Sequence, residues 1–232
     1  MKKDLDDKIR QLYDTFSVYP LNRGMEGCPC CVKDTDKMRL LSKPLRELAA
    51  DDLSKYYWKA MTTWGAVDDF KHFLPRFFEL IVTDNITFDA FMIFDRLEYG
   101  KWETWSLTEI ESIKSVIEAW WINSTLLNCQ FDGGNFGFFL RALGSVEPLI
   151  NNWDVSVDTN SFRNLIYFVF DNFQLYKIGK NIDEKHFKVL SNWIAAQAPT
   201  MEQGFYYYEK TEPDFAQTIS YCYDIALRQH AV

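Results

Sequence analysis

The residue types best suited to holding a metal ion are concentrated in one short segment. Cys28, Cys30 and Cys31 lie in the run Cys-Pro-Cys-Cys, and the interval between the first and last of them is that of a zinc knuckle. Thiolates hold zinc tetrahedrally, so a closed site needs a fourth ligand. His72, one of three histidines in the chain, is the leading candidate. The zinc site that the sequence admits therefore consists of Cys28, Cys30, Cys31 and His72.

Other interpretations of the same segment stay open. The fourth ligand can instead be one of four residues elsewhere in the chain, namely Cys129, Cys222, His186 or His230. No second Cys-x-x-C accompanies the first, and reduced cysteines commonly serve only to pack an irregular loop. A redox motif is the weakest interpretation, because no βαβ pattern surrounds the segment. We expect a packing role first and no cofactor, with zinc as the one exception.

Carboxylates near His72 indicate a second kind of chemistry. Asp68, Asp69 and His72 share a helical face because of their three- and four-residue spacing. A metal-dependent enzyme centred on His72, with nearby carboxylates or cysteines, is the alternative function. His72 can also form a purely structural polar cluster with Arg76 and Glu79, which we prefer. The chain has no Gly-x-Ser-x-Gly and no P-loop, so we expect a non-enzymatic protein ahead of the enzyme.

Five aromatic residues are candidates for partner binding: Trp102, Trp105, Tyr206, Tyr207 and Tyr208. The tyrosines are consecutive, so they point around a helix and one face is expected to be partly exposed. Exposed Trp and Tyr are typical anchors of protein interfaces. The opposing interpretation is that these rings pack between helices, with only a hydroxyl or indole edge in water.

Composition limits the classes of partner. The chain of 232 residues is 17% aromatic and carries a net charge of -8. Nucleic acid binding depends on Lys and Arg contacts to phosphate, so we expect no nucleic acid partner. A protein partner with a basic surface fits the charge better. The sequence leaves the oligomeric state open.

Segments for membrane insertion or export are not expected. The first ten residues are basic and acidic without an apolar stretch after them, so they do not form a secretory signal. No apolar run reaches the roughly 18 residues of a membrane-spanning helix. The chain has five cysteines, an odd number, and three of them are clustered, which argues against a secreted disulfide framework. We therefore expect a reduced, cytoplasmic protein without a membrane partner.

Caps and breakers recur at helix-length intervals, which predicts an all-α fold of about ten helices in a single domain, 1–232. The best-signalled helix begins at the capping box Ser106-Leu-Thr-Glu109. Residues 21–43 are expected to form an irregular cysteine-containing loop, and Pro75 is expected to kink or break its helix. The predicted helices span residues 4–16, 53–64, 67–82, 88–99, 107–128, 136–143, 146–153, 160–173, 184–197, 201–210 and 213–229.

These helices form antiparallel pairs of roughly 35 to 45 residues, and this pattern of elements resembles HEAT and armadillo arrays. The resemblance implies a solenoid-like stack of pairs. It carries no functional residues, because no consensus residue of those families is matched. An irregular helical bundle is the alternative architecture.

The leading expectation for function is an intracellular protein-binding or scaffold module with an acidic, aromatic-bearing groove between helices. Small acidic helical proteins that neutralise a basic toxin are an example by analogy of fold. We also expect the cysteine loop to pack against the helix that carries His72. If no metal is bound there, His72 is expected to hydrogen-bond to a backbone carbonyl or a carboxylate.

Overall fold

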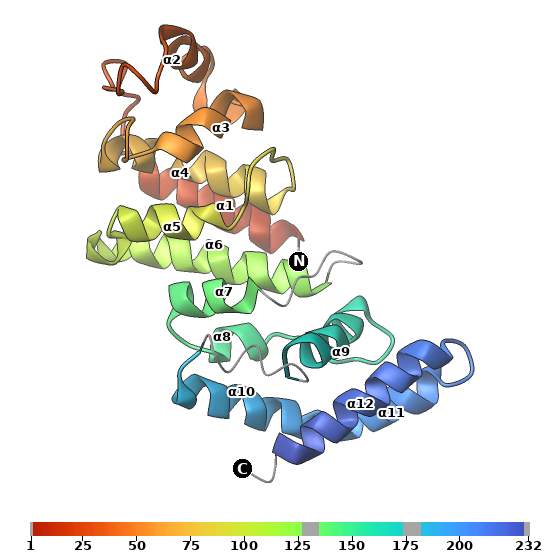
Figure 1. The fold of residues 1–232 in the computed structure, drawn as a ribbon. Helices are drawn as coiled ribbons and strands as arrows, with labels where there is room; N and C mark the ends of the chain where they lie inside the picture. The colour runs from red at the N-terminus through yellow and green to blue at the C-terminus, as the bar shows by residue number, and fades with distance from the viewer. Residues whose placement is uncertain (1, 127–134, 174–181, 230–232) are drawn as a thin grey trace. The chain divides into compact units, whose positions relative to one another are not determined.

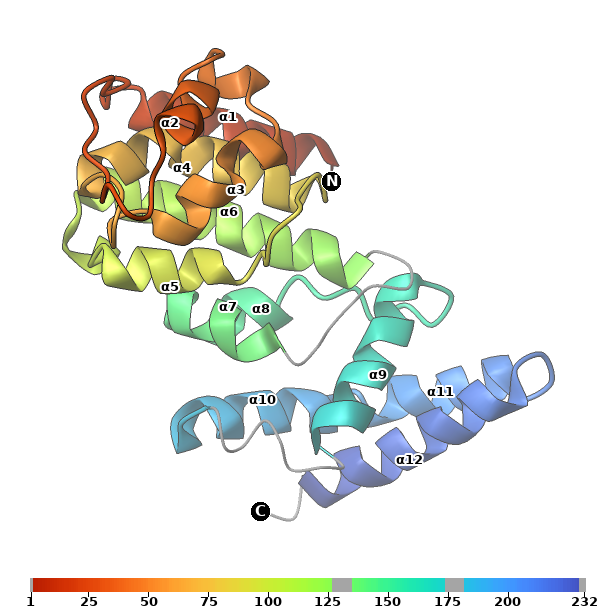
Figure 2. The ribbon, with the colours of Figure 1, turned by 45° about the horizontal axis from the view of Figure 1, so that its top comes forward.

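The computed structural model describes residues 2–126, 135–173 and 182–229. Within these ranges the chain forms twelve α-helices, two short 3-10 helices and no strand, so the all-α prediction is confirmed. None of the described helices combines the length and the apolar character needed to cross a membrane. Figure 1 and Figure 2 show the order of the helices along the chain.

The chain divides into two compact units, Met1–Val116 and Ile117–Val232, and the division falls inside α6 (Leu107–Leu126). Antiparallel helix pairs occur, but a single domain and a solenoid arrangement stay predictions.

Unit 1 is organised around α4 (Val67–Val82), against which α1 (Lys2–Phe16) packs. The helix α4 is buried over most of its circumference, and Phe70, Phe73 and Phe77 are each at most 1% exposed. The other elements of unit 1 are α2 (Asp34–Leu40), η1 (Leu45–Glu47), α3 (Ala50–Lys59), α5 (Met92–Tyr99), η2 (Trp102–Thr104) and the first half of α6.

Aromatic side chains fill the core of unit 1. Tyr56 of α3 lies 4.8 Å from Phe73 between ring centroids, and Tyr57 lies 4.9 Å from Phe77 and 4.2 Å from Phe88. Rings at these separations bury large apolar areas and gain from edge and offset contacts. The high aromatic content of the sequence is therefore used mainly for packing in this unit.

Unit 2 contains the second half of α6 and the helices that follow. The helices α11 (Ala198–Tyr208) and α12 (Pro213–Gln229) run antiparallel, and α12 also packs against α9 and α10 (Figure 2). The remaining elements are α7 (Phe136–Leu143), α8 (Glu147–Ile150), α9 (Asn160–Phe173) and α10 (Glu184–Ala196). Its core holds Trp121, whose indole donates to the carbonyl of Leu149 at 2.8 Å.

Several boundaries differ from those predicted. The helix α3 ends at Lys59 instead of residue 64, because Met61 takes a left-handed conformation with φ 62°. The helix α4 continues through Pro75, so the expected break does not occur. The helix α2 lies within residues 21–43, which were predicted to form an irregular loop. The last two residues of the helix predicted at 107–128 lie outside the described residues.

Candidate metal centre

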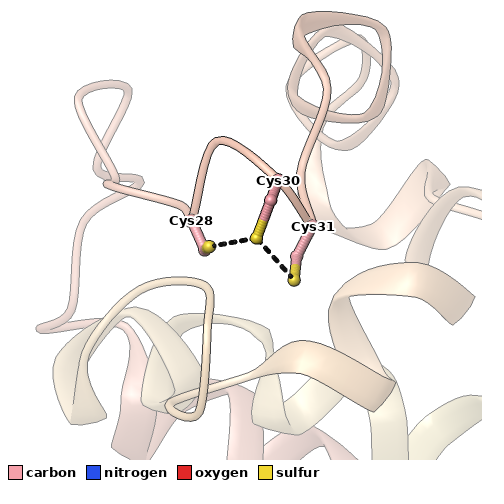
Figure 3. A group of neighbouring side chains, drawn as sticks. All are labelled: Cys28, Cys30 and Cys31. Atoms are coloured by element: carbon pink, nitrogen blue, oxygen red, sulfur yellow. Dashed lines mark hydrogen bonds between the residues drawn. The ribbon is translucent and has the colours of Figure 1, made fainter.

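Three thiols converge on a loop of unit 1. The sulfur atoms of Cys28, Cys30 and Cys31 all lie within 4.8 Å of one another, and Figure 3 shows them on the same side of the backbone. The Cys28 and Cys30 sulfurs are 2.9 Å apart, and those of Cys30 and Cys31 are 3.5 Å apart. Cys30 is exposed, whereas Cys28 and Cys31 are half-buried. Within the described residues, this is the only group of three or more potential metal ligands.

A tight turn brings the thiols together. The amides of Cys31 and Val32 both donate to the carbonyl of Cys28 at 2.9 Å. Pro29 occupies the second position of this turn, where its fixed φ is favoured. Backbone hydrogen bonds of the Cys-Pro-Cys-Cys turn therefore bring its two ends together.

The thiol loop, residues 25–32, is held on the connection between α3 and α4. The Cys28 amide donates to the carbonyl of Thr63 at 2.8 Å, and the Gly65 amide donates to the carbonyl of Glu26 at 2.8 Å. Gly27 and Trp64 accordingly form an isolated antiparallel bridge. These bonds satisfy backbone groups that the loop cannot pair by itself.

Two close approaches fix the loop further. A Cβ at Gly27 would lie 2.9 Å from the Cβ of Val32, a buried side chain that closes the loop. Gly65 has φ +72°, and a Cβ there would lie 2.6 Å from the sulfur of Met25. Gly27 is required because a side chain would have no space there. Gly65 is required for space and also for its left-handed backbone conformation.

The three thiols share one network of hydrogen bonds. A hydrogen bond from Cys30 lowers the pKa of Cys28. The hydrogen bonds to Cys28 and Cys31 raise the pKa of Cys30 to about 11. The hydrogen bond from Cys30 therefore favours the thiolate form of Cys28. A cation that binds here replaces the protons that hold the sulfurs together.

The geometry suits an ion bound by three sulfurs. Zn–S bonds of about 2.3 Å at tetrahedral angles separate two sulfur ligands by about 3.8 Å. The pair at 3.5 Å is close to this separation, and the pair at 2.9 Å needs to open by about 0.9 Å. The cluster can thus hold a thiophilic ion after a small side-chain adjustment.

His72 does not belong to the group of thiols. Its Nδ1 lies 2.8 Å from the carbonyl oxygen of Tyr19. The loop is hydrogen-bonded to the connection before α4, and Met25 of the loop and Asp69 of α4 both border Gly65. Of the four predicted ligands, the structure brings the three cysteines together.

The other residues considered as fourth ligand have different partners or are not described. Cys222 is buried in α12 and donates to the carbonyl of Ile166 at 3.3 Å. His186 lies 2.7 Å from the carboxylate of Asp183, which also caps α10. Cys129 and His230 lie outside the described residues.

The five aromatic residues predicted to bind a partner fall into different environments. Tyr206 and Tyr207 are 64% and 55% exposed. Trp102 and Tyr208 are each 5% exposed, and the Tyr208 hydroxyl donates to the carbonyl of Val157. Trp105 is half-buried and donates to the carbonyl of Gly100. Of these five residues, only Tyr206 and Tyr207 have the exposed rings that a partner-binding role requires. Trp102 and Tyr208 are buried in the packing of the protein.

A buried ionic network in unit 1 was not predicted. The ammonium of Lys71 contacts the Glu109 carboxylate at 2.8 Å and the Tyr19 hydroxyl at 2.9 Å, and it lies 4.3 Å above the Trp105 ring. The capping box identified Glu109, since its carboxylate accepts from the amide and hydroxyl of Ser106. No local signal identified Lys71 as its partner, because the two residues are 38 positions apart.

No family model, no curated protein and no solved structure matches this chain. The assignment of chemistry therefore depends on the geometry alone.

Proposed function

We propose that this chain is a metal-binding protein that holds zinc on the thiol loop. The observation that supports the proposal best is the convergence of three cysteine sulfurs within 4.8 Å on a loop tied to the helices of unit 1. Thiolate sulfur is a preferred ligand of zinc, and soft ligands of this kind disfavour magnesium and calcium. Free thiols require a reducing compartment, which agrees with the cytoplasmic localisation expected from the sequence.

The arrangement fits an open site better than a closed structural one. Closed sites have four protein ligands, whereas this group supplies three. Cys30 is exposed, so the fourth position faces solvent and accepts water or a ligand from a bound partner. No carboxylate or histidine joins the described group to act as a base. We therefore assign the ion a binding role and not a hydrolytic one.

Cobalt titration of reduced, metal-free protein tests the proposal, because thiolate-to-cobalt charge transfer reports sulfur ligands directly. We expect one equivalent of Co²⁺ to bind and to be displaced by Zn²⁺. Cys28→Ser, Cys30→Ser and Cys31→Ser should each weaken binding and reduce the charge-transfer band. The matched control, Cys129→Ser with Cys222→Ser, keeps only the loop thiols and should bind as the natural protein does.

Two results would reject the zinc proposal. One is a natural protein that binds no cobalt or zinc under reducing conditions. The other is binding that survives the loss of Cys30 but disappears in the control without Cys129 and Cys222. A preference for Cu⁺ over Zn²⁺ would leave the thiol site in place but contradict the choice of ion.

A second candidate function is protein binding by unit 2. Tyr206 and Tyr207 are neighbouring exposed rings on α11, and such rings are common anchors in interfaces. The pair α11 and α12 is acidic. With the connection between them, the two helices carry five carboxylates, Glu202, Glu209, Glu212, Asp214 and Asp224, against two cations, Lys210 and Arg228. A partner with a basic surface would complement this pair of helices.

Affinity capture from the cells of origin tests the second function, with Tyr206→Ala/Tyr207→Ala compared with Tyr99→Ala. Tyr99 is 56% exposed in unit 1 and is the matched control. We expect basic proteins that are captured by the natural chain and by the control, released by salt, and lost with the double variant. Identical sets of captured proteins would contradict this function.

A further inference from the structure

A cavity of about 370 Å³ lies between the end of α2, residues 41–48 and α4. Small-molecule sites are commonly of this size and are mostly apolar with a few polar groups. Leu40, Leu48 and Phe73 are each 1% exposed, so their positions are fixed by packing. Leu21 and Leu45 extend the apolar lining toward the rim. The walls therefore suit an aliphatic or aromatic group.

The polar part of the lining has one sign of charge. Its ionisable side chains are Arg23, Lys43 and His72, and no carboxylate lines the cavity, although the chain as a whole carries a net charge of -8. Lys43 is paired with Asp52 at 2.7 Å. Arg23 forms no hydrogen bond or ion pair with any residue that the structure describes, so its guanidinium is available to a ligand.

His72 has one defined and one available ring nitrogen. A carbonyl oxygen only accepts, so the 2.8 Å contact with Tyr19 places a hydrogen on Nδ1. Nε2 has no partner among the residues described. The ring is also held edge-on against Phe73, at 4.8 Å between centroids. The imidazole is thus fixed in the wall of the cavity with Nε2 as a hydrogen-bond acceptor, so it gives the carboxylate of a ligand no donor, and Arg23 is the donor on which a carboxylate depends.

We propose that this cavity, the Arg23 pocket, binds a small amphiphilic carboxylate. The apolar part of the ligand would lie against Leu40, Leu45 and Phe73, and its carboxylate would pair with Arg23 near Lys43. A guanidinium matches a carboxylate with two parallel hydrogen bonds, which a lysine cannot provide. The proposal is independent of zinc, because none of the three cysteines lines the cavity.

Calorimetric titration with octanoate tests the pocket, with 1-octanol and octylamine as probes of the same chain length. We expect saturable binding of octanoate only. Arg23→Gln should weaken it about tenfold or more, since a charged hydrogen-bond donor is lost. Arg10→Gln is the matched control, because Arg10 is an exposed arginine of unit 1 outside the cavity, and it should have no effect.

Two further variants distinguish binding in the pocket from binding elsewhere on the protein. Leu41→Trp fills the cavity from its rim and should abolish octanoate binding while the protein stays folded by circular dichroism. Cys28→Ser, which removes a zinc ligand, should leave octanoate binding unchanged. Equal binding of octanoate and 1-octanol, equal affinity in Arg23→Gln and Arg10→Gln, or no saturable binding at millimolar octanoate would each overturn the proposal.

Discussion

The ammonium of Lys71 in α4 lies 2.8 Å from the carboxylate of Glu109 in α6, and both side chains are less than 10% exposed. The Tyr19 hydroxyl completes the contact by donating to the same carboxylate at 2.7 Å. This ionic group joins three segments of unit 1 that are far apart in the sequence. It combines the N-terminal cap of α6 with the only buried lysine of the described chain.

Loss of Glu109 should destabilise unit 1 strongly. Glu109→Ala leaves a buried ammonium without its counter-charge and removes the cap of α6, so we expect about 3 to 5 kcal/mol less unfolding free energy. Lys71→Met should lower the unfolding free energy by less than Glu109→Ala does, because Tyr19 and Ser106 still donate hydrogen bonds to the Glu109 carboxylate. Chemical denaturation measures both.

The control is the ion pair between Lys55 and Asp36, which is more exposed than that of Lys71 and Glu109. Lys55→Met should change the unfolding free energy by less than about 1 kcal/mol, because solvent screens the pair. Similar losses for Glu109→Ala and Lys55→Met would show that the buried network stabilises unit 1 no more than an exposed pair does.

Stability should also depend on pH through Glu109. Burial by itself would raise the pKa of this carboxyl, but hydrogen bonds from Lys71, Tyr19 and Ser106 outweigh burial and lower it from 4.5 to about 2. A carboxyl with a lowered pKa in the folded state stabilises the protein above its unfolded pKa. That contribution is lost as the pH falls from 4.5 toward 2.

Denaturation of the natural protein and of Glu109→Gln over this pH range measures the effect. The amide does not titrate, so the difference in unfolding free energy between the two proteins should shrink as the pH falls. A difference that stays constant down to the lowest pH would contradict the assignment.

Gly204 in α11 should be intolerant of any side chain. A Cβ there would lie 2.4 Å from the ring of Phe162 in α9, whose side chain is fully buried. Gly204→Ala should therefore cost about 1 to 3 kcal/mol of unfolding free energy through overpacking. Adding Phe162→Leu should recover part of the loss in a double-mutant cycle. Gly24→Ala, where the nearest atom is 3.5 Å away, is the neutral control.

Gly27 should position the thiols without touching the ion. Gly27→Ala forces Val32 out of its contact, which disturbs the turn that gathers the sulfurs. We expect weaker cobalt binding although all three loop thiols remain. Gly24→Ala in the preceding residues should bind as the natural protein does. Unchanged affinity in Gly27→Ala would show that the loop geometry does not preorganise the site.

The helices were predictable because their signals are local. The capping box at Ser106 and Glu109 and the first-turn Pro213 each lie within a few residues of the helix end that they define, and those ends are found as predicted. The helix α2 was not predicted because Lys33 to Lys37 reads as a charged segment. The start of α2 is capped by the bond from the Lys33 amide to the Asp36 carboxylate.

The candidate site was only partly predictable, because part of it depends on contacts between residues that are far apart in the sequence. The thiols of Cys28, Cys30 and Cys31 meet because a local turn gathers them, and their spacing indicated this. The position of His72 depends on tertiary contacts, since its ring bonds to Tyr19, 53 residues away. Spacing along the chain contains no information about such contacts.

Zinc-edge X-ray absorption of the protein loaded with one equivalent of Zn²⁺ tests the central claim most directly, because it counts sulfur ligands. We predict three sulfurs at about 2.3 Å and one lighter ligand. The spectrum of His72→Gln should be the same, because His72 lies outside the group of thiols. A shell with fewer than three sulfurs, or a spectrum that changes when His72 is replaced, would contradict a site made by Cys28, Cys30 and Cys31.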